Sequence, residues 1–218
     1  MIRLKPLSFS SEVESKRVAV VGNSLSLFDS KWGADIDEHD IVIRFNKPAV
    51  LLHKDASETH GNKFDFWAFW SVGSFHRSVL KDENCIEDIK TAFYKNTKIR
   101  KIQTAINGHI SLTRDHIDYT LDRTIYLKLG NILKQMSNNS KITPSVGISI
   151  LQWLMYSDVK EVSIYGFDFK KTPTFSELEQ YKTDMNGQFD TRCKHNFKSE
   201  EEYVNSVILK DKRFKLYT

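Results

Sequence analysis

The sequence predicts an α/β protein with a mostly parallel, twisted sheet and helices on its faces. The run Val18-Ala19-Val20-Val21 is continuously apolar instead of alternating, which is typical of a strand buried on both sides. Similar β-branched runs alternate along the chain with helical patterns, as they do in βα units. Because the 218 residues are 40% hydrophobic and no break in composition divides them, we expect one Rossmann-like domain over residues 1–218.

Four strands, one short helix and one longer helix are expected in the first half of the chain. The first strand ends at Gly22, where small polar residues turn the chain, and a short helix follows. The second strand is again apolar and ends at Asn46. The strands are expected at residues 17–22, 40–46, 64–69 and 99–106, and the helix at residues 84–94.

Two helices and a strand are expected next. Residues 121–136 carry an apolar stripe with helical spacing. Residues 145–157 form the clearest helix, because their apolar residues share one face and Pro144 stands just before them as a helix opener. The chain then returns as a strand over residues 160–169.

The end of the chain contains a long polar stretch, a helix and a strand. Residues 170–194 show little periodicity, and a stretch of this length is a candidate mobile active-site lid. Ser199 and Glu202 form a capping-box pattern, which predicts a helix start. A last strand is expected at residues 214–217.

Composition limits the kinds of partner. The formal charge of +4 and pI near 8.9 suit an anionic small substrate or an acidic membrane surface better than a nucleic acid. Cys85 and Cys193 have no metal-ligand spacing, so we expect plain thiols and no metal site. Since no apolar run approaches the roughly 20 residues of a bilayer span and the first residues lack a secretory signal, we expect a cytoplasmic protein, or one peripheral to the inner face of the membrane.

Small polar residues follow the first two strands. Gly22-Asn23-Ser24 ends the first strand, and Arg44 and Asn46 end the second. Open parallel sheets bind ligands at this edge, and strand-end amides can recognise a base or sugar. A single glycine does not make a dinucleotide fingerprint. Two other interpretations stay open: a plain strand-to-helix turn at Gly22, and an ion pair of Arg44 with Asp37 or Asp40.

Ser145, Val146 and Gly147 open the helix that follows Pro144. The free N–H groups and positive dipole end of a helix start suit a phosphate, and a glycine there permits close approach. The alternative is that Ser145 or Thr143 only caps its own helix.

His195 stands five places before Glu200, just ahead of the last expected helix. A carboxylate beside an imidazole fixes its tautomer and raises its basicity, as a general base requires. An ordinary surface histidine and a glutamate placed by the helix dipole would give the same pattern.

In this order the segments resemble the motifs of sialyltransferases. Residues 20–24 and 36–46 are similar to the large sialylmotif, residues 144–147 and 162–168 to the small one, and His195 with Glu200 to the very small one. The chain also resembles bacterial family 42 enzymes that cap lipooligosaccharide, as well as family 29. It departs from the animal pattern at Arg17, where a cysteine is common, and at Val146, where a threonine is common.

The resemblance implies a sialyltransferase variant of the GT-A type that moves sialic acid from CMP-sialic acid to a glycan hydroxyl, with inversion, without metal or other cofactor, in bacterial surface polysaccharide or lipooligosaccharide synthesis. It implies His195 as the base, supported by Glu200. The residues expected to hold CMP, including two lysines where bacterial enzymes often have a tyrosine, are Gly22, Asn23, Ser24, Arg44, Asn46, Ser145, Val146, Gly147, Gly166, Lys170 and Lys171.

Acceptor binding is expected from aromatic residues after the third strand and from a nearby loop. Trp67 and Trp70 can stack on sugar faces, with Asn107 and His109 close by, although the two tryptophans suit a core equally well. Three alternatives stay open: a CMP-Kdo transferase, a retaining enzyme with Asp168 as nucleophile, and a non-catalytic nucleotide-binding module. The sequence does not specify the acceptor or the oligomeric state.

Overall fold

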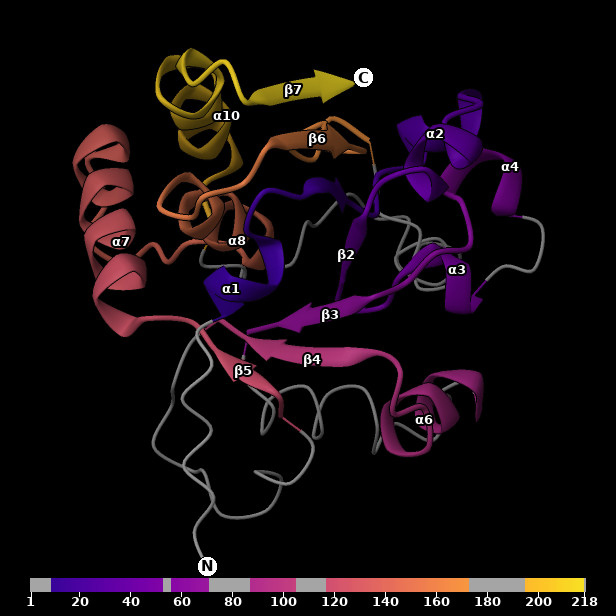
Figure 1. Cartoon of the computed structure of the whole chain (residues 1–218). Helices are drawn as coiled ribbons and strands as arrows, with labels where there is room; N and C mark the ends of the chain where they lie inside the picture. Colours follow the sequence, from indigo (N-terminus) through magenta and orange to yellow (C-terminus); the bar gives the residue numbers. More distant parts are fainter. Residues whose placement is uncertain (1–8, 53–55, 71–86, 105–116, 173–194, 218) are drawn as a thin grey trace, which may run out of the picture.

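A single parallel sheet organises the part of the chain that the computed structural model describes, which comprises residues 9–52, 56–70, 87–104, 117–172 and 195–217. Within these ranges seven strands follow the order β5-β4-β3-β2-β1-β6-β7, and every neighbouring pair is parallel (Figure 1). The strands are β1 (Arg17–Val21), β2 (Ile41–Phe45), β3 (Phe66–Phe69), β4 (Arg100–Gln103), β5 (Tyr119–Thr120), β6 (Glu161–Tyr165) and β7 (Phe214–Tyr217).

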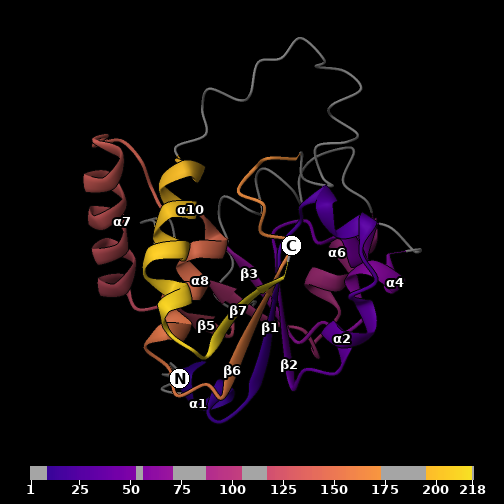
Figure 2. The same ribbon diagram turned by 90° about the horizontal axis from the view of Figure 1, so that it is seen from above.

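Helices cover both faces of the sheet. Figure 2 shows the sheet between a layer with α7, α8 and α10 and a layer with α2, α4 and α6. The helices are α1 (Phe9–Val13), α2 (Gly33–Asp37), α3 (Ala49–Leu52), α4 (Ser57–His60), α6 (Glu87–Tyr94), α7 (Arg123–Ser137), α8 (Val146–Met155) and α10 (Phe197–Ser206), with 3₁₀ turns η1 (Leu25–Asp29) and η4 (Ile208–Lys210).

The strand order reverses direction beside β1. Strands β2 to β5 extend the sheet to one side, whereas β6 and β7 extend it to the other. Ligands of open α/β sheets bind at such a switch point, outside the carboxyl ends of the strands. The ends of β1, β2 and β6 are therefore where a site is expected.

Apolar packing explains why β1 lies at the centre. Val18 and Val20 are fully buried in the larger core, which contains α8 and α10 residues, while Ala19 and Val21 are buried on the opposite face with Leu27. A strand covered on both faces has no reason to alternate, which is the pattern in the sequence.

The predicted fold class is confirmed, and the predicted elements that fall on the described residues are present, most of them with shifted ends. The strand expected over 160–169 stops at Tyr165, because Gly166 adopts a φ of 65° that turns the chain. The predicted capping box at Ser199 is wrong: α10 starts at Phe197, and the Asn196 side chain accepts a hydrogen bond from the Ser199 N–H. Helix α1 and strand β5 were not expected.

Candidate functional site

A cavity of about 350 Å³ lies where β1, β2 and β6 end. Its lining comes from the loops after these strands, from the first turn of α8 and from the start of α10. The lining residues are Gly22, Asn23, Ser24, Phe45, Asn46, Ser145, Val146, Gly147, Ile148, Gly166, Phe167, Asp168, Phe169, Lys170, His195, Phe197 and Glu200.

The loops after β1 and β6 touch through their backbones. A Cβ atom on Gly22 would lie 2.2 Å from the Gly166 carbonyl oxygen, so a glycine is required for this approach. Asn23 donates from Nδ2 to the Phe45 carbonyl (3.0 Å). Its Oδ1 is buried and has no hydrogen-bond partner among the described residues, so the structure offers a buried acceptor for a ligand N–H or O–H beside the cavity.

The first turn of α8 is shaped by two side chains. Ser145 caps the helix by accepting from the Ile148 N–H, and its own N–H and hydroxyl donate to the two carboxylate oxygens of Glu200 (2.8 and 2.7 Å). The amides of Val146 and Gly147 remain as the donors of the first turn that a ligand can use. Both the capping and the phosphate-binding interpretations of this segment therefore fit the geometry.

Glu200 is almost fully buried. Burial raises the pKa of Glu200 from 4.5 to about 7, while the hydrogen bonds from the Ser145 hydroxyl and N–H act in the opposite direction. Because a buried carboxylate without partners would be costly, the two bonds from Ser145 are what make this position tolerable.

His195 has a partner other than the one expected. Its Nδ1 lies 2.8 Å from the Thr143 carbonyl oxygen, whereas Glu200 bonds to Ser145. The prediction that Glu200 orients His195 is therefore wrong. A carbonyl can only accept, so Nδ1 carries the proton and Nε2 keeps its lone pair. Burial lowers the pKa of His195, the bond to Thr143 opposes this, and the nearby charge of Lys170 lowers it further.

The sequence itself indicates that this carbonyl is available as an acceptor. Thr143 precedes Pro144, and a residue before proline is held in an extended conformation outside the helix. Its carbonyl oxygen is therefore free of the helical ladder and can accept from an imidazole. Thr143 is the main site residue that sequence reasoning missed.

The two lysines after β6 separate in the structure. Lys170 lines the cavity, and it is the sole lysine or arginine among the described residues that do so. Lys171 does not line the cavity and forms an exposed ion pair with Glu201 of α10 (2.6 Å), so its predicted role at the phosphate is wrong. Asp168 also lines the cavity and accepts hydrogen bonds from the turn that follows it.

Arg44 does not line the cavity, so its predicted contact with CMP is wrong. It is buried on the opposite face of the sheet, where Nε donates to the Lys63 carbonyl (2.9 Å) and Nη2 to the His60 carbonyl (2.6 Å). Burial lowers the pKa of Arg44 to about 10, and the charges of Asp37 and Asp65 oppose that shift. The electrostatic partner Asp37 was one of the two alternatives expected.

Of the two tryptophans, Trp67 belongs to the core. It is fully buried, packs against Phe93 (5.8 Å between ring centroids) and donates from Nε1 to the Asn46 carbonyl (2.8 Å), so its predicted acceptor role is wrong. Asn46 itself lines the cavity with a left-handed φ of 47°. The bond from Trp67 therefore helps to hold a cavity residue in place.

Trp70 is 37% exposed just after β3, outside the cavity lining. Burial raises the pKa of Tyr126, and hydrogen bonding with the side chains of Trp70 and Thr143 opposes that rise, so the three side chains lie near one another. Asn107, His109 and residues 173–194 of the expected lid lie outside the described residues.

Two observations concern metals and membranes. In the described ranges, no three His, Cys, Asp or Glu side chains gather as a metal ion would require. Within the same ranges, none of the helices is both long and apolar enough to cross a bilayer.

Comparison with known sequences identifies relatives over most of the chain. The model of glycosyltransferase family 29 (sialyltransferase) matches residues 3–212. The chain is 25% identical over 217 residues to the type 2 lactosamine alpha-2,3-sialyltransferase of Homo sapiens, which covers 91% of this chain and 64% of that protein. Over 44 residues it is 52% identical to CMP-N-acetylneuraminate-beta-galactosamide-alpha-2,3-sialyltransferase 1 of Mus musculus, covering 20% of this chain and 13% of that protein. The chain thus spans just under two thirds of the length of the first of these relatives.

Solved structures share the fold. A mammalian sialyltransferase superposes with a TM-score of 0.57 at 16% identity, covering 93% of this chain and 69% of that one. The sialyltransferase CstII from Campylobacter jejuni, in complex with cytidine-5'-monophosphate, superposes with a TM-score of 0.51 at 16% identity, covering 94% and 79%. At these identities the similarity concerns the architecture alone.

Proposed function

Because the chain belongs to glycosyltransferase family 29, the sialyltransferases, we propose that it transfers sialic acid from CMP-sialic acid to a hydroxyl of a glycan acceptor. The observation that carries the proposal is the cavity at the switch point, where His195 with a protonated Nδ1 faces the same space as the first turn of α8. A base and an anion-binding helix start in one cavity are what such a transfer needs.

In the proposed reaction, His195 is the general base. Its Nε2 takes the proton of the acceptor hydroxyl as that oxygen attacks the anomeric carbon of the sugar, and the bond from this carbon to the phosphate oxygen breaks. The hydrogen bond from Nδ1 to Thr143 keeps the imidazole in the required tautomer. Direct attack by the acceptor inverts the anomeric centre, and CMP leaves with the bonding electrons.

The charge that develops on CMP requires stabilisation. We assign this to the Lys170 ammonium and to the Val146 and Gly147 amides at the N-terminus of α8. These groups support a transfer that needs no divalent cation, so activity should survive treatment with EDTA. The buried Oδ1 of Asn23 is the group we assign to a donor hydroxyl or amino group.

The acceptor is proposed to approach past Trp70. This indole is partly exposed and lies near Tyr126 and near Thr143, whose carbonyl accepts the hydrogen bond from His195. An acceptor sugar stacked on Trp70 would present its hydroxyl toward the base. A bacterial surface glycan as the natural acceptor stays a prediction.

The test is release of CMP from CMP-sialic acid and from CMP-Kdo, with a panel of galactose-terminated acceptors. Faster release of CMP from CMP-sialic acid supports the proposal. Faster release from CMP-Kdo would mean that the transferred sugar is Kdo, and binding of CMP without turnover would indicate a non-catalytic module. His195→Asn keeps an amide donor for the Thr143 carbonyl but removes the base, and it should lower kcat/KM roughly 100- to 10,000-fold.

A matched control exists in the same chain. His39 is buried, its Nδ1 lies 2.8 Å from the Asp35 carbonyl oxygen, and it does not line the cavity. His39→Asn should therefore retain the transfer rate. Equal losses in the two variants would mean that His195 acts on folding and not as the base.

A further inference from the structure

The turn after β6 contains two consecutive residues in a disfavoured backbone conformation. Phe169 and Lys170 have φ values of 56° and 66°, although neither is a glycine. Residues with a Cβ rarely adopt this left-handed backbone conformation, and two such residues in succession need support from the surrounding structure. Both residues line the cavity, so the support bears directly on the site.

The support comes from the carboxylate of Asp168. Its Oδ1 accepts from the Lys170 N–H (3.0 Å), and its Oδ2 accepts from the Thr172 N–H (2.7 Å) and from the Thr172 hydroxyl. The Asp168 carbonyl also accepts from the Lys171 N–H (3.2 Å). Each amide from Lys170 to Thr172 therefore donates to Asp168, which closes the turn around it.

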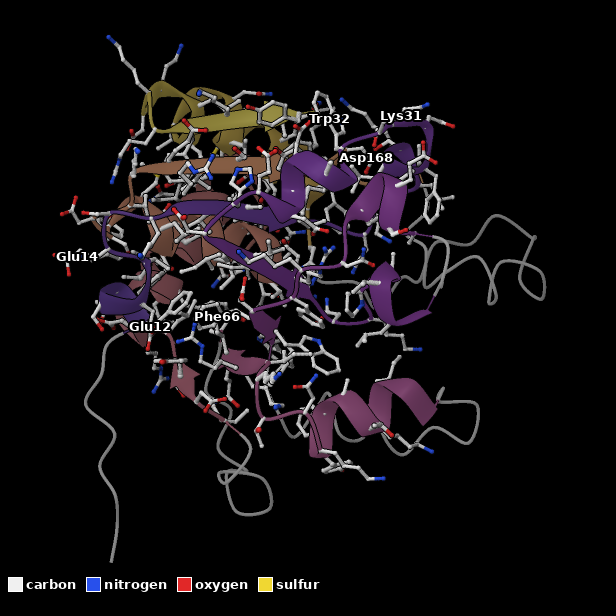
Figure 3. The ribbon with its side chains drawn as sticks, turned by 45° about the vertical axis from the view of Figure 1, so that its right-hand side comes forward. Glu12, Glu14, Lys31, Trp32, Phe66 and Asp168 are labelled. Atoms are coloured by element: carbon white, nitrogen blue, oxygen red, sulfur yellow. The ribbon has the colours of Figure 1, made fainter. Side chains whose placement is uncertain are left out.

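The same turn is attached to the loop after β1. The Thr172 hydroxyl donates to Asp168, so the Ser24 hydroxyl, 2.9 Å away, donates to Thr172. Ser24 in turn accepts from the Ser26 N–H (3.1 Å). Figure 3 shows Asp168 and Glu12, which precedes β1, at opposite ends of the strands, as expected for a residue at the carboxyl edge of the sheet.

Two roles for Asp168 make opposite demands. A nucleophile of a retaining reaction needs a carboxylate oxygen free to form a bond with carbon. In this structure both oxygens accept hydrogen bonds from the turn, and those bonds fix where the Lys170 backbone lies. The hydrogen bonds therefore favour a role in holding the turn.

We propose that Asp168 is a positioning residue, which holds the Phe169–Lys170 turn in its left-handed conformation and so places the Lys170 ammonium over the cavity as the contact for the donor phosphate. The inference rests on the proposed function, since it names the phosphate of a CMP-sugar as the ligand. It excludes Asp168 as a nucleophile. It also makes Ser24 and Thr172 parts of the same support.

Charge alone and the positioning role predict opposite effects of Asp168→Asn on CMP binding. Asp168 is an acidic side chain that lines the cavity, so removal of its charge alone would strengthen the binding of an anion. If Asp168 acts by positioning Lys170, Asp168→Asn must instead weaken CMP binding, because an amide cannot accept all three hydrogen bonds. The sign of the change distinguishes the two accounts.

The experiment measures the affinities of CMP and cytidine by calorimetry for the wild type, Asp168→Asn, Lys170→Met and the double variant. Both single variants should weaken CMP binding by about tenfold or more and leave cytidine, which has no phosphate, unchanged. In the Lys170→Met background, Asp168→Asn should have no further effect on CMP. Lys171→Met and Asp158→Asn are matched controls, because both side chains are exposed and outside the cavity lining.

Thr172→Val provides a milder variant should Asp168→Asn fold poorly. It keeps the Thr172 N–H bond to Asp168 but removes the hydroxyl bonds to Asp168 and Ser24, so it should weaken CMP binding in the same selective way and to a smaller degree. In parallel, hydrogen exchange of the Lys170 and Thr172 amides should accelerate in Asp168→Asn without ligand.

The outcomes separate this inference from the proposed function. If wild-type protein binds neither CMP nor cytidine, the proposed function fails, and the inference fails with it. Three results would overturn only the positioning role, provided that the wild type binds CMP. They are a higher affinity for CMP in Asp168→Asn, an equal loss of affinity for CMP and cytidine, and a full effect of Asp168→Asn on CMP affinity in the Lys170→Met background. A glycosyl adduct on Asp168 in intact-protein mass spectra would overturn it as well.

Discussion

Replacing Glu200 by glutamine should make the protein more stable at neutral and alkaline pH. Glu200 is almost fully buried, and burial raises its pKa from 4.5 to about 7. Glutamine has nearly the same shape and can still accept from the Ser145 N–H, while the serine hydroxyl can reorient to accept from its amide. The substitution therefore removes the ionisation and leaves the packing in place.

The size of the expected stability change follows from the pKa shift of Glu200. The folded protein binds the Glu200 proton more tightly than the unfolded chain, so the stabilisation is complete below pH 4.5 and is lost as the pH rises through about 7. A shift from 4.5 to about 7, at roughly 1.4 kcal/mol per pKa unit, corresponds to about 3 kcal/mol. Most of this loss should fall between pH 5 and 8. The lowered pKa of His195 acts in the opposite direction, since it adds stability as the pH rises through about 6.5.

Urea unfolding of the wild type and Glu200→Gln at pH 5, 6, 7 and 8 measures the effect. The difference in free energy of unfolding between the two proteins cancels groups that titrate alike in both, His195 included. Relative to the wild type, Glu200→Gln should gain about 2–3 kcal/mol between pH 5 and 8. A difference that does not change with pH would refute the reasoning, because it would mean that Glu200 titrates alike in the folded and unfolded states.

Two further matched pairs test the packing of the site. A Cβ on Gly147 would lie 2.7 Å from the Phe167 ring, so Gly147→Ala should lower the free energy of unfolding by about 1–3 kcal/mol. In α7 the nearest atom to a Cβ on Gly130 would be 3.6 Å away, so Gly130→Ala should raise the free energy of unfolding by up to about 1 kcal/mol. Urea unfolding compares the two variants, and a loss of stability in both would contradict the clash at Gly147. Trp67→Ala should cost about 3–5 kcal/mol of stability because the ring lies in the core. Trp70→Ala should leave the affinity for CMP unchanged and raise the KM for the acceptor. An unchanged KM for the acceptor would show that Trp70 is not part of the acceptor site.

The central strands could be predicted because the signal for burial is local. Residues 18–21 and 41–43 are apolar without interruption, and β7 was expected with its observed bounds. Strand β5 escaped prediction because it contains two residues at the edge of the sheet, and helix α1 because it has only five. Such short elements depend on tertiary packing, which a window of sequence does not contain.

The loop residues of the site were predictable for a topological reason, whereas some side chains were not. The ends of parallel strands converge at one edge, so Gly22, Asn46 and Gly166 meet whatever the details of packing. Arg44 and Trp67 are partners in the β2–β3 register, and both side chains lie on the face away from the cavity. The orientation of a side chain at a strand end depends on register, which one sequence does not reveal.

The position of β1 beside β6 has a consequence for how the protein reaches its folded state. Val21 pairs with Arg44 of β2 through a short connection, but it meets Tyr165 of β6 only after most of the chain has intervened. Parallel pairing at such separation closes slowly, because the entropy of a long loop is lost before the contact forms. Until β6 docks, β1 is an unpaired apolar edge, the kind of surface at which chains associate with one another. We therefore expect yield in refolding to depend on protein concentration, with residues 17–21 as the first segment to require protection.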